Sequence, residues 1–260
     1  MASLQIVEVA MFGFGKGKNG SGKGGDGRPP VDTPPPEPAA VVEAEPSPAP
    51  PAITSAFSGA VGEITPDEAL ELLKAGNRAF LTGEGVLQQV TAKDLSEDLQ
   101  SGQQPFAVIV GCADSRAAPT LIFNQGLGRL FIVRVAGNTI DRRGLASVAY
   151  AVKHLKVPLV VVLGHTGCGA VAAAEAVVDG RIELDSALEE MITPIIPAVL
   201  QARHKHPADP AVAAVEENAR RVAARLRSAE TILDEAIEAG RLKVVAAVKE
   251  LRTGEVRFLD

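Results

Sequence analysis

Four short runs of apolar residues place the strongest constraint on what this chain can fold into. These runs, rich in β-branched side chains, lie at Phe106–Val110, Leu130–Val135, Leu159–Leu163 and Lys243–Val248. Helical stretches separate them, and strands that are apolar along their whole length are typical of a parallel sheet buried on both faces. The pattern therefore predicts an α/β fold with a mainly parallel central β-sheet of about four strands, flanked by helices.

The segments between and after these runs carry helical patterns and helix boundary signals. Helices are expected at Leu145–Leu155, Cys168–Val178, Ala187–Arg203, Pro210–Arg227 and Ala229–Ala239. Asp209 can cap the fourth of these helices, and Gly240 is a suitable stop for the fifth. The turn-like residues 252–255 then precede Val256–Leu259, which is expected to add an antiparallel edge strand.

An earlier predicted helix has a well-marked start. Thr65 can cap it, Pro66 suits its first turn, and Glu68 can complete a capping box. The apolar side chains that follow indicate that this helix runs to about Phe80. The pattern around Leu95–Leu99 indicates a further short helix.

The composition changes sharply near residue 60. Residues 13–27 are rich in glycine and residues 29–51 in proline, and neither stretch can bury enough apolar surface to offset the entropy lost on folding. Residues 1–60 are therefore expected to form a disordered, Gly/Pro-rich extension, and residues 61–260 the folded domain. The short apolar start of the extension could dock to a partner protein and tether the domain to an assembly. The alternative is a frayed terminus without a partner.

The composition also argues against several classes of function. The hydrophobic content of 46% supports a real core, and the formal charge of −6 argues against a nucleic-acid partner. No apolar run is long enough to span a bilayer, and residues 1–14 lack the basic lead and the cleavage site of a secretory signal. A cytoplasmic location is therefore expected, unless the extension directs the protein to a compartment.

The two cysteines of the chain, Cys112 and Cys168, each lie in a segment that begins directly after an apolar run. The first segment reads Gly-Cys-Ala-Asp-Ser-Arg over residues 111–116, and the second reads Gly-His-Thr-Gly-Cys-Gly over residues 164–169. Because the carboxyl ends of parallel strands meet at one edge of a sheet, the two segments are expected to lie together. Two thiolates and the imidazole of His165 suit zinc. The alternative, a Cys112–Cys168 disulfide, gives no role to His165.

Three protein ligands leave one coordination position of a zinc ion free, which is typical of a catalytic site that activates water. Cys168 is expected in the first turn of its helix, where unpaired N–H groups favour a thiolate. Two thiolates cancel the charge of Zn²⁺, so the bound water is less acidic than at a site of neutral ligands. A nearby proton acceptor then becomes useful.

Asp114 is the candidate proton acceptor. Arg116 can hold its carboxylate by a bidentate, charge-assisted pair that keeps it ionised and oriented. If this pair breaks, Asp114 could become a fourth zinc ligand, which would close the metal site and inactivate it. The alternative is an ordinary surface ion pair, which contributes little. The position of the pair beside Cys112 favours the catalytic interpretation.

Taken together, the two segments resemble the signature of the β-class carbonic anhydrase family, in residues Cys112-Ala113-Asp114-Ser115-Arg116 and His165-Thr166-Gly167-Cys168-Gly169. The likeness extends over roughly residues 64–260. It implies a parallel-sheet α/β fold and reversible hydration of CO2 to bicarbonate, with an Asp114–Arg116 dyad. It also implies one zinc ion (Zn²⁺) per subunit, held by Cys112, His165 and Cys168. Family members are homodimers or higher homo-oligomers, with the active-site cleft at the subunit interface.

The resemblance points to further positions. Gln103 matches, by its offset before the first cysteine, a family glutamine that hydrogen-bonds bicarbonate, and Gln104 is the neighbour with which it could be confused. Residues 134–138 resemble a family loop beside the site, with no chemistry assigned to them. Phe123 and Tyr150 are expected to fill the core and not to contact substrate.

The resulting hypothesis is a zinc enzyme in which zinc hydroxide, formed with the help of Asp114, attacks CO2 that Gln103 helps to orient. Two alternatives stay open. The same site could hydrolyse carbonyl sulfide or carbon disulfide, or it could be a catalytically silent zinc site in a scaffold or binding protein. The complete Asp114–Arg116 pair argues against the second alternative, because a structural zinc site does not need it.

Overall fold

A computed structural model of the chain describes residues 64–83, 102–205 and 207–259. All of them fall in the unit that spans Pro50–Asp260. The extension predicted at residues 1–60 and the short helix predicted at Leu95–Leu99 lie outside the described residues, so both stay predictions.

A five-stranded sheet forms the centre of the fold. Its strands are β1 (Ala107–Gly111), β2 (Leu130–Arg134), β3 (Leu159–His165), β4 (Lys243–Lys249) and β5 (Val256–Phe258). Their order is β2-β1-β3-β4-β5; the first four strands are parallel, and β5 pairs antiparallel with β4. This arrangement confirms the predicted fold class, including the antiparallel edge strand.

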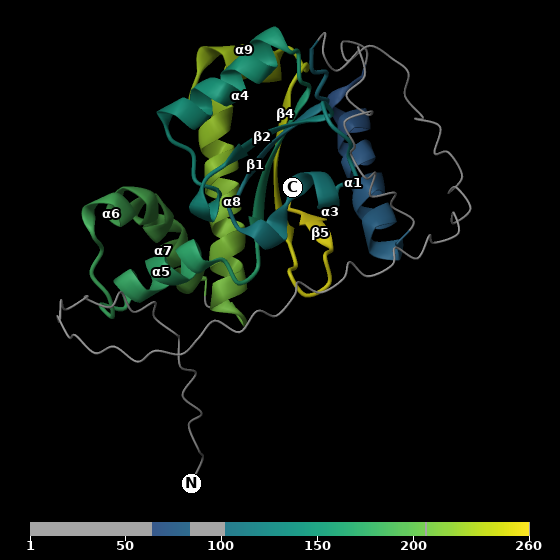
Figure 1. The fold of residues 1–260 in the computed structure, drawn as a ribbon. Coiled ribbons are helices and arrows are strands. Elements are labelled where there is room, and N and C mark those ends of the chain that lie inside the picture. Colours follow the sequence, from purple (N-terminus) through teal and green to yellow (C-terminus); the bar gives the residue numbers. More distant parts are fainter. Residues whose placement is uncertain (1–63, 84–101, 206, 260) are drawn as a thin grey trace, which may run out of the picture. The chain divides into compact units, whose positions relative to one another are not determined.

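Helices cover the sheet and the region beyond its carboxyl edge (Figure 1). The α-helices are α1 (Pro66–Thr82), α3 (Pro119–Ile122), α4 (Arg142–His154), α5 (Gly169–Val178), α6 (Ser186–Ile192), α7 (Ile196–His204), α8 (Pro210–Ser228) and α9 (Thr231–Glu238). Short 3-10 turns are η2 (Ser115–Ala117), η3 (Ala136–Asn138) and η4 (Thr193–Ile195). Among the described residues, no helix is both long enough and apolar enough to cross a membrane.

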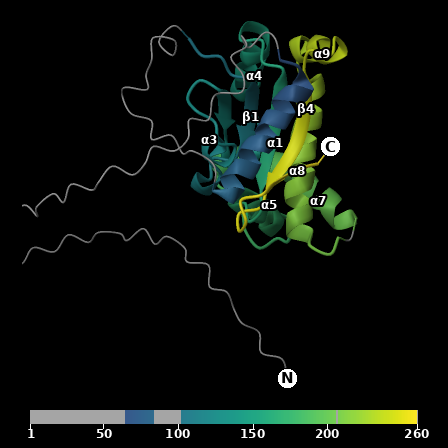
Figure 2. The same ribbon diagram turned by 90° about the vertical axis from the view of Figure 1, so that its right-hand side faces the viewer.

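Alternate side chains of the strands pack into two separate cores. Val108 and Val160 pack with residues of α4, α8 and α9, whereas Ile109 and Val161 pack with residues of α1 and α3. Figure 1 shows α8 and α1 on opposite sides of the strands, and Figure 2 shows α1 in front of the sheet. Successive residues of a strand point to opposite faces, so burial of both faces explains why β1, β3 and the interior of β4 are apolar on both faces.

A third apolar cluster lies beyond the carboxyl ends of the strands. It is built from α5, α6, α7 and the start of α8, and it includes Cys112 and Cys168. Both cysteines are therefore surrounded by apolar side chains that limit the access of water.

Two predicted helix starts are confirmed. The Glu68 N–H donates to the Thr65 hydroxyl at 3.3 Å, and the Thr65 N–H donates to the Glu68 carboxylate at 2.7 Å. At the start of α8, the Val212 N–H donates to the Asp209 carboxylate at 3.0 Å. The predicted capping residues thus satisfy backbone groups that a helix terminus leaves unpaired.

The helix predicted at Ala187–Arg203 was wrong as a single element. Helix α6 ends at Ile192, η4 follows, and α7 begins at Ile196. Pro194 and Pro197 explain the break, because proline has no N–H to donate and its ring clashes with the preceding turn of a helix.

The prediction for Tyr150 was also wrong. Its side chain is 49% exposed on the outer surface of α4, where its ring contacts Phe131 and His154. Phe123 is fully buried in the core beneath α1, as predicted.

Candidate metal centre

The carboxyl ends of two adjacent strands bring the predicted ligands together. Cys112 directly follows β1, His165 is the last residue of β3, and Cys168 is the N-cap of α5. Gly111 lies opposite Leu163 in the pairing of β1 with β3, so the residues that follow emerge side by side. The two sulfur atoms and a ring nitrogen of the histidine all lie within 4.8 Å of one another.

The imidazole of His165 has the orientation of a metal ligand. Its side chain is fully buried, and Nδ1 lies 3.0 Å from the carbonyl oxygen of Thr166. That contact places the ring proton on Nδ1 and leaves Nε2 as an acceptor, an arrangement common in metal-binding histidines. Nε2 is buried and has no hydrogen-bond partner. A buried polar atom without a partner costs free energy, and coordination of a metal would remove that cost.

The sulfur of Cys112 accepts two backbone hydrogen bonds, from Asp114 N–H at 3.4 Å and from Gly137 N–H at 3.3 Å. The hydrogen bond with Cys168 lowers the pKa of Cys112 most, and the N–H groups of Asp114 and Gly137 lower it further, whereas burial raises it. These groups therefore stabilise the thiolate form that a metal needs.

The surroundings shift the pKa of Cys168 in the opposite direction, upward. Its hydrogen bond with Cys112 and its burial raise the pKa of Cys168, while the N–H groups of Val171 and Ala170 lower it. The pair thus holds one negative charge readily, and a second thiolate needs a cation beside it. Two sulfurs and one imidazole nitrogen form a donor set that fits zinc.

Asp114 and Arg116 form a two-point ion pair. The Asp114 Oδ1 accepts from the Arg116 Nε at 3.0 Å and from its backbone N–H at 2.9 Å, and Oδ2 accepts from Nη2 at 2.7 Å. These bonds from Arg116 hold the pKa of Asp114 well below its usual range, although partial burial opposes them. The Asp114 Oδ2 lies 3.9 Å from the His165 Nε2. An ionised carboxylate therefore stands beside the nitrogen that faces the metal position.

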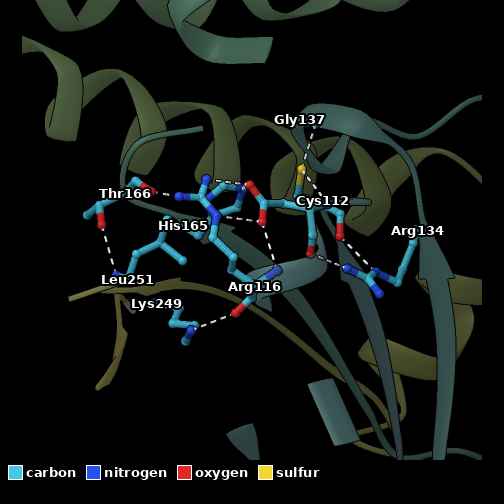
Figure 3. A network of polar contacts seen from close by, with 9 residues as sticks. Cys112, Arg116, Arg134, Gly137, His165, Thr166, Lys249 and Leu251 are labelled. Atoms are coloured by element: carbon cyan, nitrogen blue, oxygen red, sulfur yellow. Dashed lines mark hydrogen bonds and ion pairs between the residues drawn. The ribbon is translucent and has the colours of Figure 1, made fainter. Parts of the chain in front are cut away.

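Two basic side chains at the ends of β2 and β4 support the first segment (Figure 3). Arg134, the last residue of β2, donates from Nε to the Cys112 carbonyl at 2.8 Å and from Nη2 to the Asp114 carbonyl at 2.5 Å. Lys249, the last residue of β4, donates from Nζ to the Arg116 carbonyl at 2.8 Å. Sequence reasoning assigned no role to either residue. The available signal was a basic residue at the end of an otherwise apolar strand.

Gly137 gives a role to the loop at residues 134–138. Its φ of +72° is in the left-handed region, and a Cβ built at this position would lie 2.6 Å from the Ile195 Cδ1. Glycine is the residue that tolerates both conditions. Its carbonyl accepts from the Asn218 Nδ2 at 2.8 Å, which helps to orient its N–H toward the sulfur of Cys112.

Gln103 and Gln104 are both exposed in the segment that precedes β1. Within the described part of the chain, no hydrogen bond or ion pair joins Gln103 to the metal-site residues. The predicted role of Gln103 in bicarbonate binding therefore stays a prediction.

Comparison with known proteins agrees with this geometry. The family profile described as carbonic anhydrase matches residues 107–256. Carbonic anhydrase 2 of Mycobacterium tuberculosis strain H37Rv is 37% identical over 199 residues, which cover 75% of this chain and 93% of that protein. The solved structure of the β-carbonic anhydrase CcaA is 25% identical, with a TM-score of 0.57 over 74% of this chain and 95% of its own. The β-carbonic anhydrase CafA of Aspergillus fumigatus is 26% identical, with a TM-score of 0.55 over 75% and 89% of the two chains.

The region matched by the family profile contains the three side chains that converge on the metal position, together with the Asp114–Arg116 pair. The match with the Mycobacterium tuberculosis enzyme covers 93% of that enzyme's length, so the likeness is not limited to a shared fragment of it. The chain belongs to the β-class carbonic anhydrase family and is a carbonic anhydrase enzyme.

Proposed function

We propose that this enzyme catalyses the reversible hydration of CO2 to bicarbonate and a proton, with one zinc ion per subunit held by Cys112, His165 and Cys168. The convergence of these three side chains within 4.8 Å carries the proposal. Bound there, zinc would acidify a water molecule and supply the nucleophile that CO2 hydration needs. Membership of the carbonic anhydrase family supports CO2 as the substrate.

In this proposal, Asp114 accepts the proton that is released at the metal centre. Its pairing with Arg116 favours the ionised form, and the 3.9 Å separation from the His165 Nε2 supports its position near the reacting atoms. The same pairing opposes a closed state in which Asp114 would turn toward the metal as a fourth ligand. Gln103 would help to orient bicarbonate.

The apolar cluster beside the cysteines suits an uncharged substrate. Ala170, Val171 and Ile195 belong to the cluster that contains Cys112 and Cys168. CO2 carries no charge, so an apolar wall admits it without the desolvation cost that a charged substrate would pay.

We further propose that the enzyme works as a homodimer or a larger homo-oligomer. Among the described residues, β2 has no strand on its outer side, and large apolar side chains are exposed on it and near it: Leu127, Ile132 and Tyr150. Light scattering of the purified protein measures the assembly directly, and a monomer at micromolar concentration would contradict this part of the proposal.

The main test combines zinc analysis with steady-state assays of the purified enzyme on CO2, carbonyl sulfide and carbon disulfide. We expect about one zinc per chain and the highest kcat/KM on CO2. A higher efficiency on a sulfur compound would overturn the choice of substrate. Bound zinc without turnover of any of the three substrates would identify a silent site.

The role of Asp114 is tested by Asp114→Ala. General acid–base groups typically contribute a factor of about 10²–10⁴, so we expect kcat to fall by at least about 100-fold while the zinc content is kept. The matched control is Asp179→Ala, because Asp179 also pairs with arginines, Arg181 and Arg203, but lies on the surface after α5. Equal kcat values in the two variants would show that Asp114 is not the proton acceptor.

A further inference from the structure

Lys249 is an unexpected residue for its position. It ends the apolar strand β4, lies opposite His165 in the pairing with β3, and is 5% exposed. Within the described part of the chain, no other lysine or arginine is buried. A buried ammonium costs free energy unless hydrogen bonds and opposite charges compensate it, so a residue of this kind needs a local reason.

The contacts of Lys249 reach both segments of the metal centre (Figure 3). Its side-chain Nζ donates to the Arg116 carbonyl at 2.8 Å, in the turn that carries the Asp–Arg pair. Its backbone carbonyl accepts from the Thr166 N–H at 3.0 Å, directly after the ligand His165. The side chain therefore holds the first segment, and the main chain of the same residue holds the second.

Lys249 is not placed to act on the reacting atoms themselves. No hydrogen bond among the described residues joins its Nζ to the Asp114 carboxylate, and both oxygens of that carboxylate accept from Arg116. The ammonium instead donates to the backbone carbonyl of Arg116, within the η2 turn. This hydrogen bond therefore acts on the Asp114–Arg116 pair through the turn.

We propose that Lys249 is a positioning residue, whose side chain holds the η2 turn so that the Arg116 guanidinium stays paired with Asp114 at the metal centre. The expected effect on turnover rests on the proposed function. The positioning itself is a property of the folded protein, and it can be measured without substrate.

Three variants separate this role from a general structural one. Lys249→Met keeps most of the side-chain length and the backbone bond to Thr166 but removes the donor, and Lys249→Arg restores a cationic donor. Lys243→Met is the matched control, because Lys243 begins the same strand but pairs with Asp67 at the surface, at 2.8 Å.

The decisive measurement is solvent exchange of the Arg116 Nε–H by NMR in the zinc-loaded protein. In Lys249→Met we expect this exchange to accelerate at least about tenfold, as the loss of one hydrogen bond predicts. The Nε–H of Arg134, which donates to the Cys112 carbonyl, is the internal reference and should not change. Lys249→Arg should restore slow exchange, and Lys243→Met should match the wild type.

The same proteins then enter the CO2 assay. In Lys249→Met, kcat should fall about tenfold while KM and the zinc content stay constant, and Lys249→Arg should recover most of the loss.

Unchanged exchange at Arg116, or equal acceleration at Arg134, would overturn the inference. If Lys249→Met does not fold, Lys249→Gln replaces it, since its polar side chain is one bond shorter and removes the ammonium from the Arg116 carbonyl; the same acceleration at Arg116 is expected. A wild type that is inactive on CO2 would refute the proposed function, while the exchange rates would still decide the role of Lys249.

Discussion

The two halves of the metal centre are held in place by different means. His165 and Cys168 lie at the end of β3 and at the N-cap of α5, so the hydrogen bonds of a strand and a helix fix their backbones. Cys112 and the Asp114–Arg116 pair lie in the connection after β1, which side chains from β2 and β4 hold. The second half thus takes its geometry from the backbone hydrogen bonds of a strand and a helix, and the first takes it from the side chains of residues distant in the sequence.

Loss of a ligand should have the largest effect, whichever half it comes from. Cys168→Ser should reduce the zinc content from about one per chain to near zero. Substitution of a residue that only supports a metal ligand typically lowers activity by roughly 10–100-fold, and loss of the ligand itself should lower kcat by more than that. Serine is a good N-cap, so the helix should persist. Metal analysis after gel filtration measures the effect.

Thermal unfolding provides the control for this variant. Metal binding contributes to folding free energy, so the serine variant should unfold below zinc-loaded wild type. Because serine can cap the helix, the variant should unfold at or slightly above the temperature of wild-type protein treated with a chelator. A serine variant that keeps about one zinc per chain would contradict the assignment of Cys168 as a ligand.

An intermediate effect is expected where a remote residue supports the first half. Arg134→Met releases the carbonyls of Cys112 and Asp114, and the loss of two bonds from a charged donor should lower the free energy of unfolding by about 2–3 kcal/mol. We expect kcat to fall by about tenfold or more. The control is Arg225→Met, which removes a bond of 3.0 Å to the Ile140 carbonyl. It should be destabilised by about 1–2 kcal/mol with its kcat unchanged.

Urea unfolding and steady-state kinetics measure these two quantities. If the two arginine variants lose stability but show the same kcat, the first half of the centre does not depend on support from β2, and the comparison fails.

The smallest effect is expected at Thr166, in the second half. Thr166→Val removes the bonds of its hydroxyl to the Glu250 carboxylate and the Leu251 N–H, both of 3.0 Å, which should cost about 1 kcal/mol of stability. Because β3 and β4 still hold His165, kcat should change by less than about threefold. A loss of kcat as large as that of Arg134→Met would show that the second half also depends on remote contacts.

The same contrast explains how much could be predicted from the sequence. The strands, most helices and the convergence of His165 with the two cysteines follow from local patterns, because a strand end and a helix start set the positions of nearby side chains. The break within residues 186–204 does not follow from the apolar spacing, which continues through it, but from Pro194 and Pro197.

The supports from Arg134 and Lys249 could not be predicted in the same way. Both depend on the strand order β2-β1-β3-β4-β5, which places the ends of β2 and β4 on either side of the first segment. No local pattern states which strands become neighbours. Tyr150 illustrates the same limit, since its exposure depends on which face of α4 meets the sheet.

Cys168 occupies a position that helices normally give to Ser, Thr, Asp or Asn, and it makes no capping hydrogen bond of their kind. In the metal-free protein, Cys168→Asp would gain about 1 kcal/mol from a proper cap and would give up a sulfur ligand. Without zinc, selection for heat resistance and selection for turnover therefore favour different residues at one site. A library of this enzyme that is screened for stability in the presence of a chelator, and without an activity assay, should replace its cysteine at residue 168.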